Sequence, residues 1–321
     1  MTRAAWACIF LFCSLEAVWS HSQFYVPSTL RVGSINEVYA WDEKALTPFS
    51  VEVWRSGASK PMIVARGFSE RVLPALSGEP PLHWSAALLC PDVLETPGPV
   101  TVRFVEGGKV LAEVASTIQL RKFSTEEIPL NRTMSELRAK PDPRKDREAQ
   151  AIWAIYERFD PEFAWAGGRF LLPVSSTAPH SAGFGDTRHY LYSDGKSDQD
   201  YHRGIDFAVP VGTLVSAPAP GTVVFVEDRL LTGITVVVEH APGLYSCYFH
   251  LSKALVRPGQ KVGAHDSLAY SGATGFVTGP HLHWEIRAES VSVDPLDLVT
   301  FGLLDTDAVS AVISSSERST H

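Results

Sequence analysis

A short stretch near the C-terminal end, Gly279-Pro280-His281-Leu282-His283-Trp284, restricts the fold more than any other part of the sequence. Side chains at i and i+2 of a β-strand project from the same face, so His281 and His283 would lie side by side. Gly279 and Pro280 are turn residues, which predicts that the strand begins at His281 and presents both rings at a sheet end. The rest of the fold must then supply the other ligands of a metal site.

A second pair of ligand-type residues, His202 and Asp206, lies further upstream. Their spacing of four places both side chains on one face of a strand. A helix would do the same, but Gly204, Pro210 and Gly212 disfavour a helix in this segment. We therefore expect a strand that presents an imidazole and a carboxylate together.

Two imidazoles and one carboxylate, with the fourth position left to water, make up a catalytic rather than a structural zinc site. One imidazole is then left over. Either His281 or His283 would bind the metal, while the other would stand beside the bound water. We predict one Zn²⁺ per chain, because a His, His, Asp set suits zinc better than other divalent ions.

His250 completes the set, in a strand-like run that ends in Tyr248-Phe-His250-Leu251. With it, the sequence resembles the LytM/lysostaphin-type zinc metallopeptidases, the M23 peptidase family. That family shares a His-x-x-x-Asp motif, a Tyr-x-His-Leu segment and a His-Leu-His motif, which appear here as His202-Arg-Gly-Ile-Asp206, Tyr248-Phe-His250-Leu251 and His281-Leu-His283. The resemblance runs from about residue 170 to residue 295.

The resemblance implies a role for each of these residues. By matching motif positions, the metal ligands are His202, Asp206 and His283, and the catalytic residues that do not bind metal are His250 and His281. One of the two catalytic histidines would take the proton of the attacking water, and the other would donate a proton to the developing charge or the leaving amine. The sequence does not decide which does which.

Two further polar residues accompany these motifs. Glu285 follows His283 at i+2 and would orient a ligand histidine, or else face water as an ordinary strand-end carboxylate. His240 precedes a turn, and we interpret it as structural. Cys90 and Cys247 are predicted to be buried thiols in different domains rather than a disulfide bridge.

Residues 1–20 are typical of an export signal, with Arg3 in a short n-region, an apolar run, and Ser20 before the expected cleavage point. A retained signal anchor is the alternative, because Glu16 and Trp19 are unusual in a cleavage region. We therefore expect an exported protein of the bacterial periplasm or cell envelope. The mildly acidic balance, with a net charge of -8 and a pI near 5.8, gives no electrostatic signal for nucleic-acid binding.

The domain organisation follows from the pattern of strands, prolines and charges. We expect a mainly β protein made of a signal peptide, an immunoglobulin-like β-sandwich, a helical connector, a LytM-type antiparallel β catalytic domain and a C-terminal tail, at residues 1–20, 21–120, 121–164, 165–300 and 301–321. The connector contains two sequences of capping-box form, beginning at Ser124 and Thr133. Helical spacing of apolar residues is found over 144–159.

The function implied by the resemblance is zinc-dependent hydrolysis of peptide crosslinks or stem peptides of bacterial peptidoglycan. The alternative is a non-catalytic or latent LytM-like module that binds the cell wall or activates a wall amidase. All five signature positions are filled, which favours catalysis, since non-catalytic relatives usually lose metal ligands. Peptidoglycan peptides are the expected partners, along with a regulatory protein; the oligomeric state does not follow from the sequence.

Overall fold

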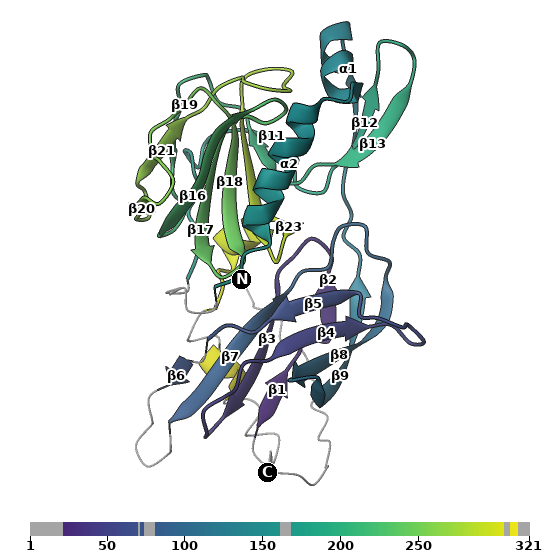
Figure 1. The fold of residues 1–321 in the computed structure, drawn as a ribbon, viewed down its shortest axis with the longest axis vertical. Coiled ribbons are helices and arrows are strands. Elements are labelled where there is room, and N and C mark those ends of the chain that lie inside the picture. The colour runs from purple at the N-terminus through teal and green to yellow at the C-terminus, as the bar shows by residue number, and fades with distance from the viewer. Residues whose placement is uncertain (1–21, 70, 74–80, 161–167, 305–308, 314–321) are drawn as a thin grey trace. The chain divides into compact units, whose positions relative to one another are not determined.

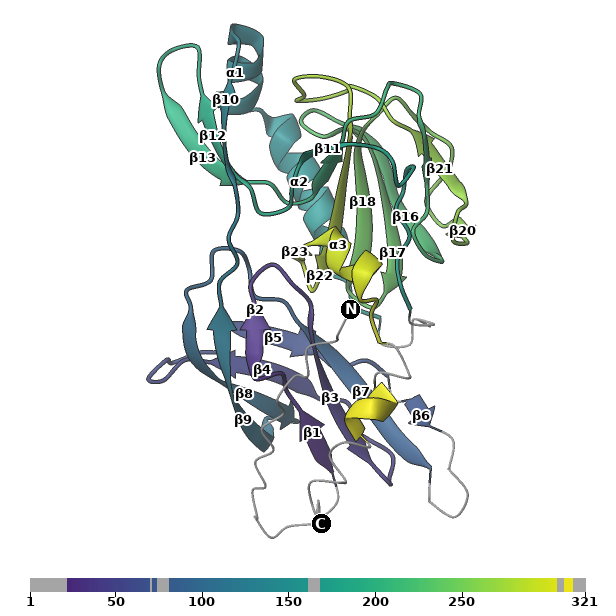
Figure 2. The same cartoon turned by 180° about the vertical axis from the view of Figure 1, so that it is seen from behind.

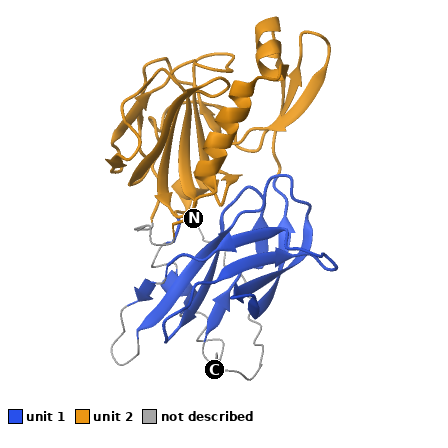
Figure 3. Ribbon diagram, in the orientation of Figure 1, with its two compact units in different colours: residues 1–121, 303–321 blue, residues 122–302 orange. Residues whose placement is uncertain are grey.

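The computed structural model describes residues 22–69, 71–73, 81–160, 168–304 and 309–313. The chain divides into two compact units, residues 1–121 with 303–321, and residues 122–302 (Figure 3). The expected export signal and the expected boundary between residues 164 and 165 lie outside the described residues. Among the helices in the described ranges, none has the length and apolar character needed to cross a membrane.

The first unit is built from two β-sheets (Figure 1). Alternation of apolar and polar residues explains its strands: in β4, Val51 and Val53 point into the core and their neighbours point outward. The two sheets pack on each other, since the rings of Phe24 in β1 and Phe104 in β8 are 4.7 Å apart. The strands, in sheet order, are β1 (Gln23–Tyr25), β3 (Asn36–Asp42), β7 (Leu82–Leu89) and β6 (Arg71–Leu73), and β2 (Thr29–Arg31), β9 (Lys109–Gln119), β8 (Gly98–Glu106), β4 (Ser50–Trp54) and β5 (Ile63–Arg66).

These sheets confirm the expectation of a mainly β protein. The immunoglobulin-like type of the sandwich stays a prediction. The segment that we expected to be a C-terminal tail belongs in part to this unit, where the backbone N–H of Leu304 donates a hydrogen bond to the Glu37 carboxylate at 3.1 Å.

The second unit contains an eight-stranded sheet in the order β11-β14-β22-β18-β17-β16-β20, with β23 paired to β22. Every residue of its central strands β18 and β22 is buried, including the polar residues of β22, which alternate with apolar ones. A strand buried on both faces requires cover on both faces. The bounds are β11 (His180–Ala182), β14 (Ile205–Phe207), β22 (Leu282–Ala288), β18 (Leu244–Leu251), β17 (Gly233–Ala241), β16 (Gly221–Arg229), β20 (Lys261–Val262) and β23 (Val291–Val293).

Helix α2 (Pro143–Tyr156) covers one face of this sheet, as Figures 1 and 2 both show. Asp142 caps its N-terminus, and Pro143 occupies the first turn, where no backbone N–H is needed. Its apolar side packs on β16, β17 and β18 in one cluster, made of Ile152, Ile155, Tyr156, Phe225, Val237, Tyr245, Cys247 and Phe249. The helix therefore shares a core with the strands of the sheet.

The prediction of a purely helical connector is wrong in its first part. Residues that follow Ser124 form strand β10 (Thr125–Pro129), which pairs in parallel with β12 (Thr187–Leu191), and β13 (Ser197–Tyr201) completes that sheet. The pairing with β12 overrides the local capping signal. The next helix, α1 (Arg132–Ala139), is capped by Asn131 rather than by Thr133.

The remaining elements of the second unit are short. A small sheet in the order β15-β21-β19 contains β15 (Leu214–Ser216), β21 (Ser267–Tyr270) and β19 (Lys253–Ala254). Helix α3 (Pro295–Thr300) begins at the capping residue Asp294. Cys90 and Cys247 are both buried free thiols, as predicted.

Candidate metal centre

Neighbouring strands of the large sheet bring the predicted ligands together. Asp206 in β14 lies directly opposite His283 in the antiparallel strand β22. His202 precedes β14, so the prediction that it shares a strand face with Asp206 is wrong. The chain turns between them at Gly204, where an added Cβ would be 2.3 Å from the carbonyl oxygen of Trp284. Only glycine permits this close approach, which places His202 beside the other two ligands.

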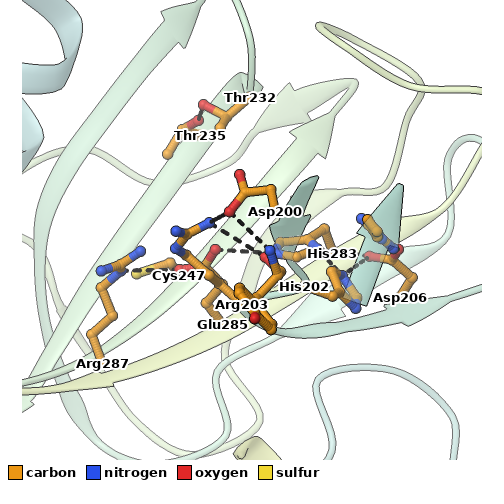
Figure 4. Close-up of polar contacts among 12 residues, drawn as sticks. Asp200, His202, Arg203, Asp206, Thr232, Thr235, Cys247, His283, Glu285 and Arg287 are labelled. Atoms are coloured by element: carbon orange, nitrogen blue, oxygen red, sulfur yellow. Dashed lines mark hydrogen bonds and ion pairs between the residues drawn. The ribbon is translucent and has the colours of Figure 1, made fainter. Parts of the chain in front are cut away.

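The three side chains converge on one point. Asp206 Oδ1 lies 2.7 Å from His283 Nδ1 and 3.1 Å from His202 Nε2, and the two ring nitrogens are 2.9 Å apart. All three residues are buried, and they form a group with the spacing needed to hold one metal ion. Figure 4 shows the three side chains close together.

The hydrogen bonds on the far sides of the rings fix which nitrogens face this point with a lone pair. His202 Nδ1–H donates to the carbonyl oxygen of Gly183 at 2.6 Å, and His283 Nε2–H donates to the Glu285 carboxylate at 3.2 Å. In neutral rings the opposite nitrogens then carry no proton. Two nitrogen lone pairs and a carboxylate oxygen would face one another, which is favourable only around a cation.

In the metal-free protein a proton supplies this positive charge. Burial alone would lower the pKa of His283, but the carboxylates of Asp206 and Glu285 raise it to about 9. Burial alone would raise the pKa of Asp206, but His283 and His202 hold it well below its usual range. A divalent metal ion would replace the proton in the same donor set, and the residues fit it.

Comparison with known proteins identifies the segment that carries these residues. Residues 200–295 match the model of peptidase family M23. This segment is an M23 domain. The resemblance expected from its motifs is therefore confirmed.

Similar proteins share this domain over part of their length. The peptidoglycan DD-endopeptidase ShyA of Vibrio cholerae is 46% identical over 85 residues, 26% of this chain and 20% of that protein. An uncharacterized metalloprotease of Haemophilus influenzae is 41% identical over 118 residues, 36% of this chain and 24% of that protein. The chain thus spans only about a fifth to a quarter of the length of these two relatives.

A solved structure extends the similarity beyond the M23 domain. The crystal structure of a candidate M23 peptidase from Pseudomonas aeruginosa superposes with a TM-score of 0.54 at 26% sequence identity. The superposition covers 81% of this chain and 92% of that one. The similarity supports the LytM-type β fold of the second unit.

His250 and His281 flank the ligand cluster of the M23 domain. Their rings are 4.9 Å apart, and His281 Nε2 is 3.7 Å from Asp206 Oδ1. His250 Nδ1–H donates to the carbonyl oxygen of Thr274, and His281 Nδ1–H donates to that of Gly279, both at 2.9 Å. Each ring is therefore held as the tautomer whose Nε2 is free to accept a proton.

His250 lies at the end of β18 with a backbone φ of 60°, in the left-handed region that few residues other than glycine adopt. Its backbone N–H donates to the carbonyl oxygen of Thr232 at 2.8 Å, which helps to hold this conformation. Burial and the nearby rings of His281 and His283 lower its pKa to about 3. His250 is thus neutral near pH 7, as a proton acceptor must be.

Glu285 lies behind the ligand cluster rather than facing water. Its Oε1 accepts the hydrogen bond of His283, and its Oε2 accepts one from Arg287 Nε at 3.0 Å. Burial alone would raise the pKa of Glu285, but Arg287 and His283 lower it to about 2. The carboxylate is therefore ionised and fixes the ring of His283, which agrees with the orienting role considered from the sequence.

Two residues stand outside the predicted chemistry. His240 is fully buried and bridges the carbonyl oxygen of Pro220 and the Ser246 hydroxyl, at 2.8 Å and 2.7 Å, so it is structural. Arg188 in β12 belongs to none of the motifs, yet its Nη2 donates to Asp206 Oδ2 at 2.7 Å. A single arginine distant from the ligands in sequence carries no spacing signal. Only the fold brings it to the site.

Proposed function

We propose that this chain is a zinc metalloendopeptidase that hydrolyses peptide bonds of bacterial peptidoglycan. The observation that carries the proposal is the convergence of three ligand atoms, His202 Nε2, His283 Nδ1 and Asp206 Oδ1. Two further histidines, His250 and His281, lie beside them and are not part of the ligand set. Three protein ligands with an open fourth position are the composition of a catalytic zinc site. A bound Zn²⁺ would lower the pKa of a water to about 7 and polarise a peptide carbonyl group.

His250 and His281 are the groups that transfer protons during the reaction. The Nε2 atoms of His250 and His281 are unprotonated in the tautomers that their backbone partners fix. One Nε2 takes a proton from the attacking water, and the resulting imidazolium hydrogen-bonds to the oxygen that becomes negative. The same proton then goes to the leaving amine as the C–N bond breaks.

The named activity of ShyA supports peptidoglycan as the substrate. Within that class we propose a crosslink between D-amino acids rather than a glycine bridge, in an exported protein of the periplasm or cell envelope. Identification of the products by mass spectrometry tests the choice of bond, and products from glycyl-glycine cleavage alone would contradict it.

The test of the function is release of soluble muropeptides from purified peptidoglycan by the full chain, with and without a chelator. We expect release that the chelator stops, that added Zn²⁺ restores, and that His281→Asn abolishes. His265→Asn is the matched control, because His265 is exposed and outside the site. Zinc bound with one ion per chain but no release would instead favour the binding or amidase-activating module.

A further inference from the structure

The two oxygens of the Asp206 carboxylate have separate partners. Oδ1 faces the ligand cluster, 2.7 Å from His283 Nδ1 and 3.1 Å from His202 Nε2. Oδ2 accepts a charge-assisted hydrogen bond from Arg188 Nη2 at 2.7 Å. The carboxylate therefore offers Oδ1 to the metal site, while Oδ2 is hydrogen-bonded to Arg188.

Arg188 is largely buried, with 17% of its side chain exposed, and Asp206 has 9% exposed. Taking a guanidinium out of water is costly unless a well-placed anion compensates it. Glu126 is the other nearby carboxylate, but its Oε2 is 3.6 Å from Arg188 Nε, too far for a hydrogen bond. In the described part of the chain that Nε has no hydrogen-bond partner. The interaction of Arg188 with Asp206 is therefore stronger than its interaction with Glu126.

The position of Arg188 in the chain makes the contact informative. It lies on β12, in the small sheet that β10 and β13 complete, whereas Asp206 lies on β14 of the large sheet. Residue 188 also precedes the segment 200–295 that matches the M23 family model. A side chain from a different sheet thus holds a group of the predicted metal centre.

We propose that Arg188 is a positioning residue that keeps Asp206 a one-oxygen ligand, so that the metal retains an open position for water. The inference rests on the proposed function, because it presumes that Asp206 binds a metal ion. A carboxylate can bind a cation through one oxygen or both. Without Arg188, Oδ2 is free to turn toward the metal and fill the position that water needs.

The test uses Co²⁺ as a spectroscopic probe in the metal-free full chain. We expect Arg188→Met to weaken Co²⁺ and Zn²⁺ binding by about 10- to 100-fold, the usual effect of losing a partner of a ligand. We also expect weaker visible absorption bands per bound Co²⁺, because a higher coordination number reduces their intensity. Arg188→Lys keeps a positive charge and should restore part of both properties.

Arg203→Met is the matched control. Arg203 follows His202, but its Nη1 donates to Asp200 at 2.8 Å and 47% of its side chain is exposed. We expect its metal affinity and Co²⁺ spectrum to stay within twofold of those of the unsubstituted protein. Should Arg188→Met fail to fold, the Arg188→Lys spectrum decides the question.

The outcomes separate this inference from the proposed function. If the unsubstituted protein binds neither metal, the proposed function fails. If it binds both, and Arg188→Met and Arg188→Lys show unchanged affinity and unchanged spectra, only the role of Arg188 is overturned. A change in the Arg203→Met protein as large as in Arg188→Met would overturn it too, because the effect would then follow from charge alone.

Discussion

The guanidinium of Arg287 lies 3.0 Å from the carboxylate of Glu285, and both side chains are buried (Figure 4). Glu285 in turn accepts the hydrogen bond of the predicted ligand His283. On its other side the guanidinium lies over the rings of Tyr156 and Trp153 in α2, 4.6 Å and 5.4 Å from their centres. The predicted metal site and helix α2 are therefore joined through one buried ion pair.

Replacement of Arg287 by Met should lower the free energy of unfolding by about 3 kcal/mol, because it removes the guanidinium from the buried Glu285 carboxylate and leaves only the hydrogen bond of His283. The double variant Glu285→Gln with Arg287→Met removes both charges and should recover part of that loss. Urea unfolding of the metal-free protein measures both. An exposed pair gives the control, since Arg203→Met should change stability little. A double variant less stable than Arg287→Met would contradict the expectation.

Removal of α2 should destabilise the M23 domain. Ile152, Ile155 and Tyr156 share a core with strands β16 to β18, and burial of each such side chain contributes roughly 1.5 to 3 kcal/mol. A fragment of residues 122–302 should therefore unfold cooperatively, whereas one of residues 168–302, which lacks β10 and α1 as well as α2, should be less stable by at least on the order of 5 kcal/mol. Denaturant titration of both fragments checks this. Equal midpoints would show that the helix contributes nothing to this core.

Much of the candidate site could be predicted from the sequence, because its ligands occur in short motifs with fixed spacing. The approach of His202 to Asp206 could not, since it depends on a turn at Gly204 against Trp284 rather than on strand periodicity. Arg188 and Arg287 were not anticipated either. Their roles depend on which strand or helix lies opposite, and pairing between distant segments leaves no local pattern.

The fold shows the same division. Apolar alternation predicted strands such as β4, and the spacing of Ile152 and Ile155 predicted α2. Strand β10 was not predicted, because Ser124 and Glu127 have the form of a helix cap, and only the parallel pairing with β12 makes the segment extended. Local propensity is a weak guide where a neighbouring strand supplies the backbone hydrogen bonds.

Replacement of Gly204 by Ala should disrupt the metal centre. The added Cβ would lie 2.3 Å from the carbonyl oxygen of Trp284, so the turn must shift and carry His202 away from Asp206. We expect metal affinity to fall by more than 10-fold, since loss of a ligand exceeds loss of a ligand's partner. Gly279→Ala is the matched control, because a Cβ there meets no atom within 4 Å. Competition with a chromophoric chelator measures both, and equal affinities would contradict the steric argument.

His240 should make the protein sensitive to mild acid. Burial lowers its pKa from 6.5 to about 4, so the unfolded chain binds the proton more readily than the folded protein does. Between pH 4 and 6.5 the unfolded state thus holds more protons, and the stability contributed by neutral His240 is complete above pH 6.5 and lost as the pH falls toward 4. The shift corresponds to about 3 kcal/mol.

Urea unfolding of the metal-free protein at a series of pH values should show that the free energy of unfolding falls between pH 6.5 and 4. His240→Gln should flatten this slope whatever its effect on stability at pH 7. His265→Asn, at an exposed position, should leave the slope unchanged. An identical slope in the His240→Gln protein would assign the acid sensitivity to other groups.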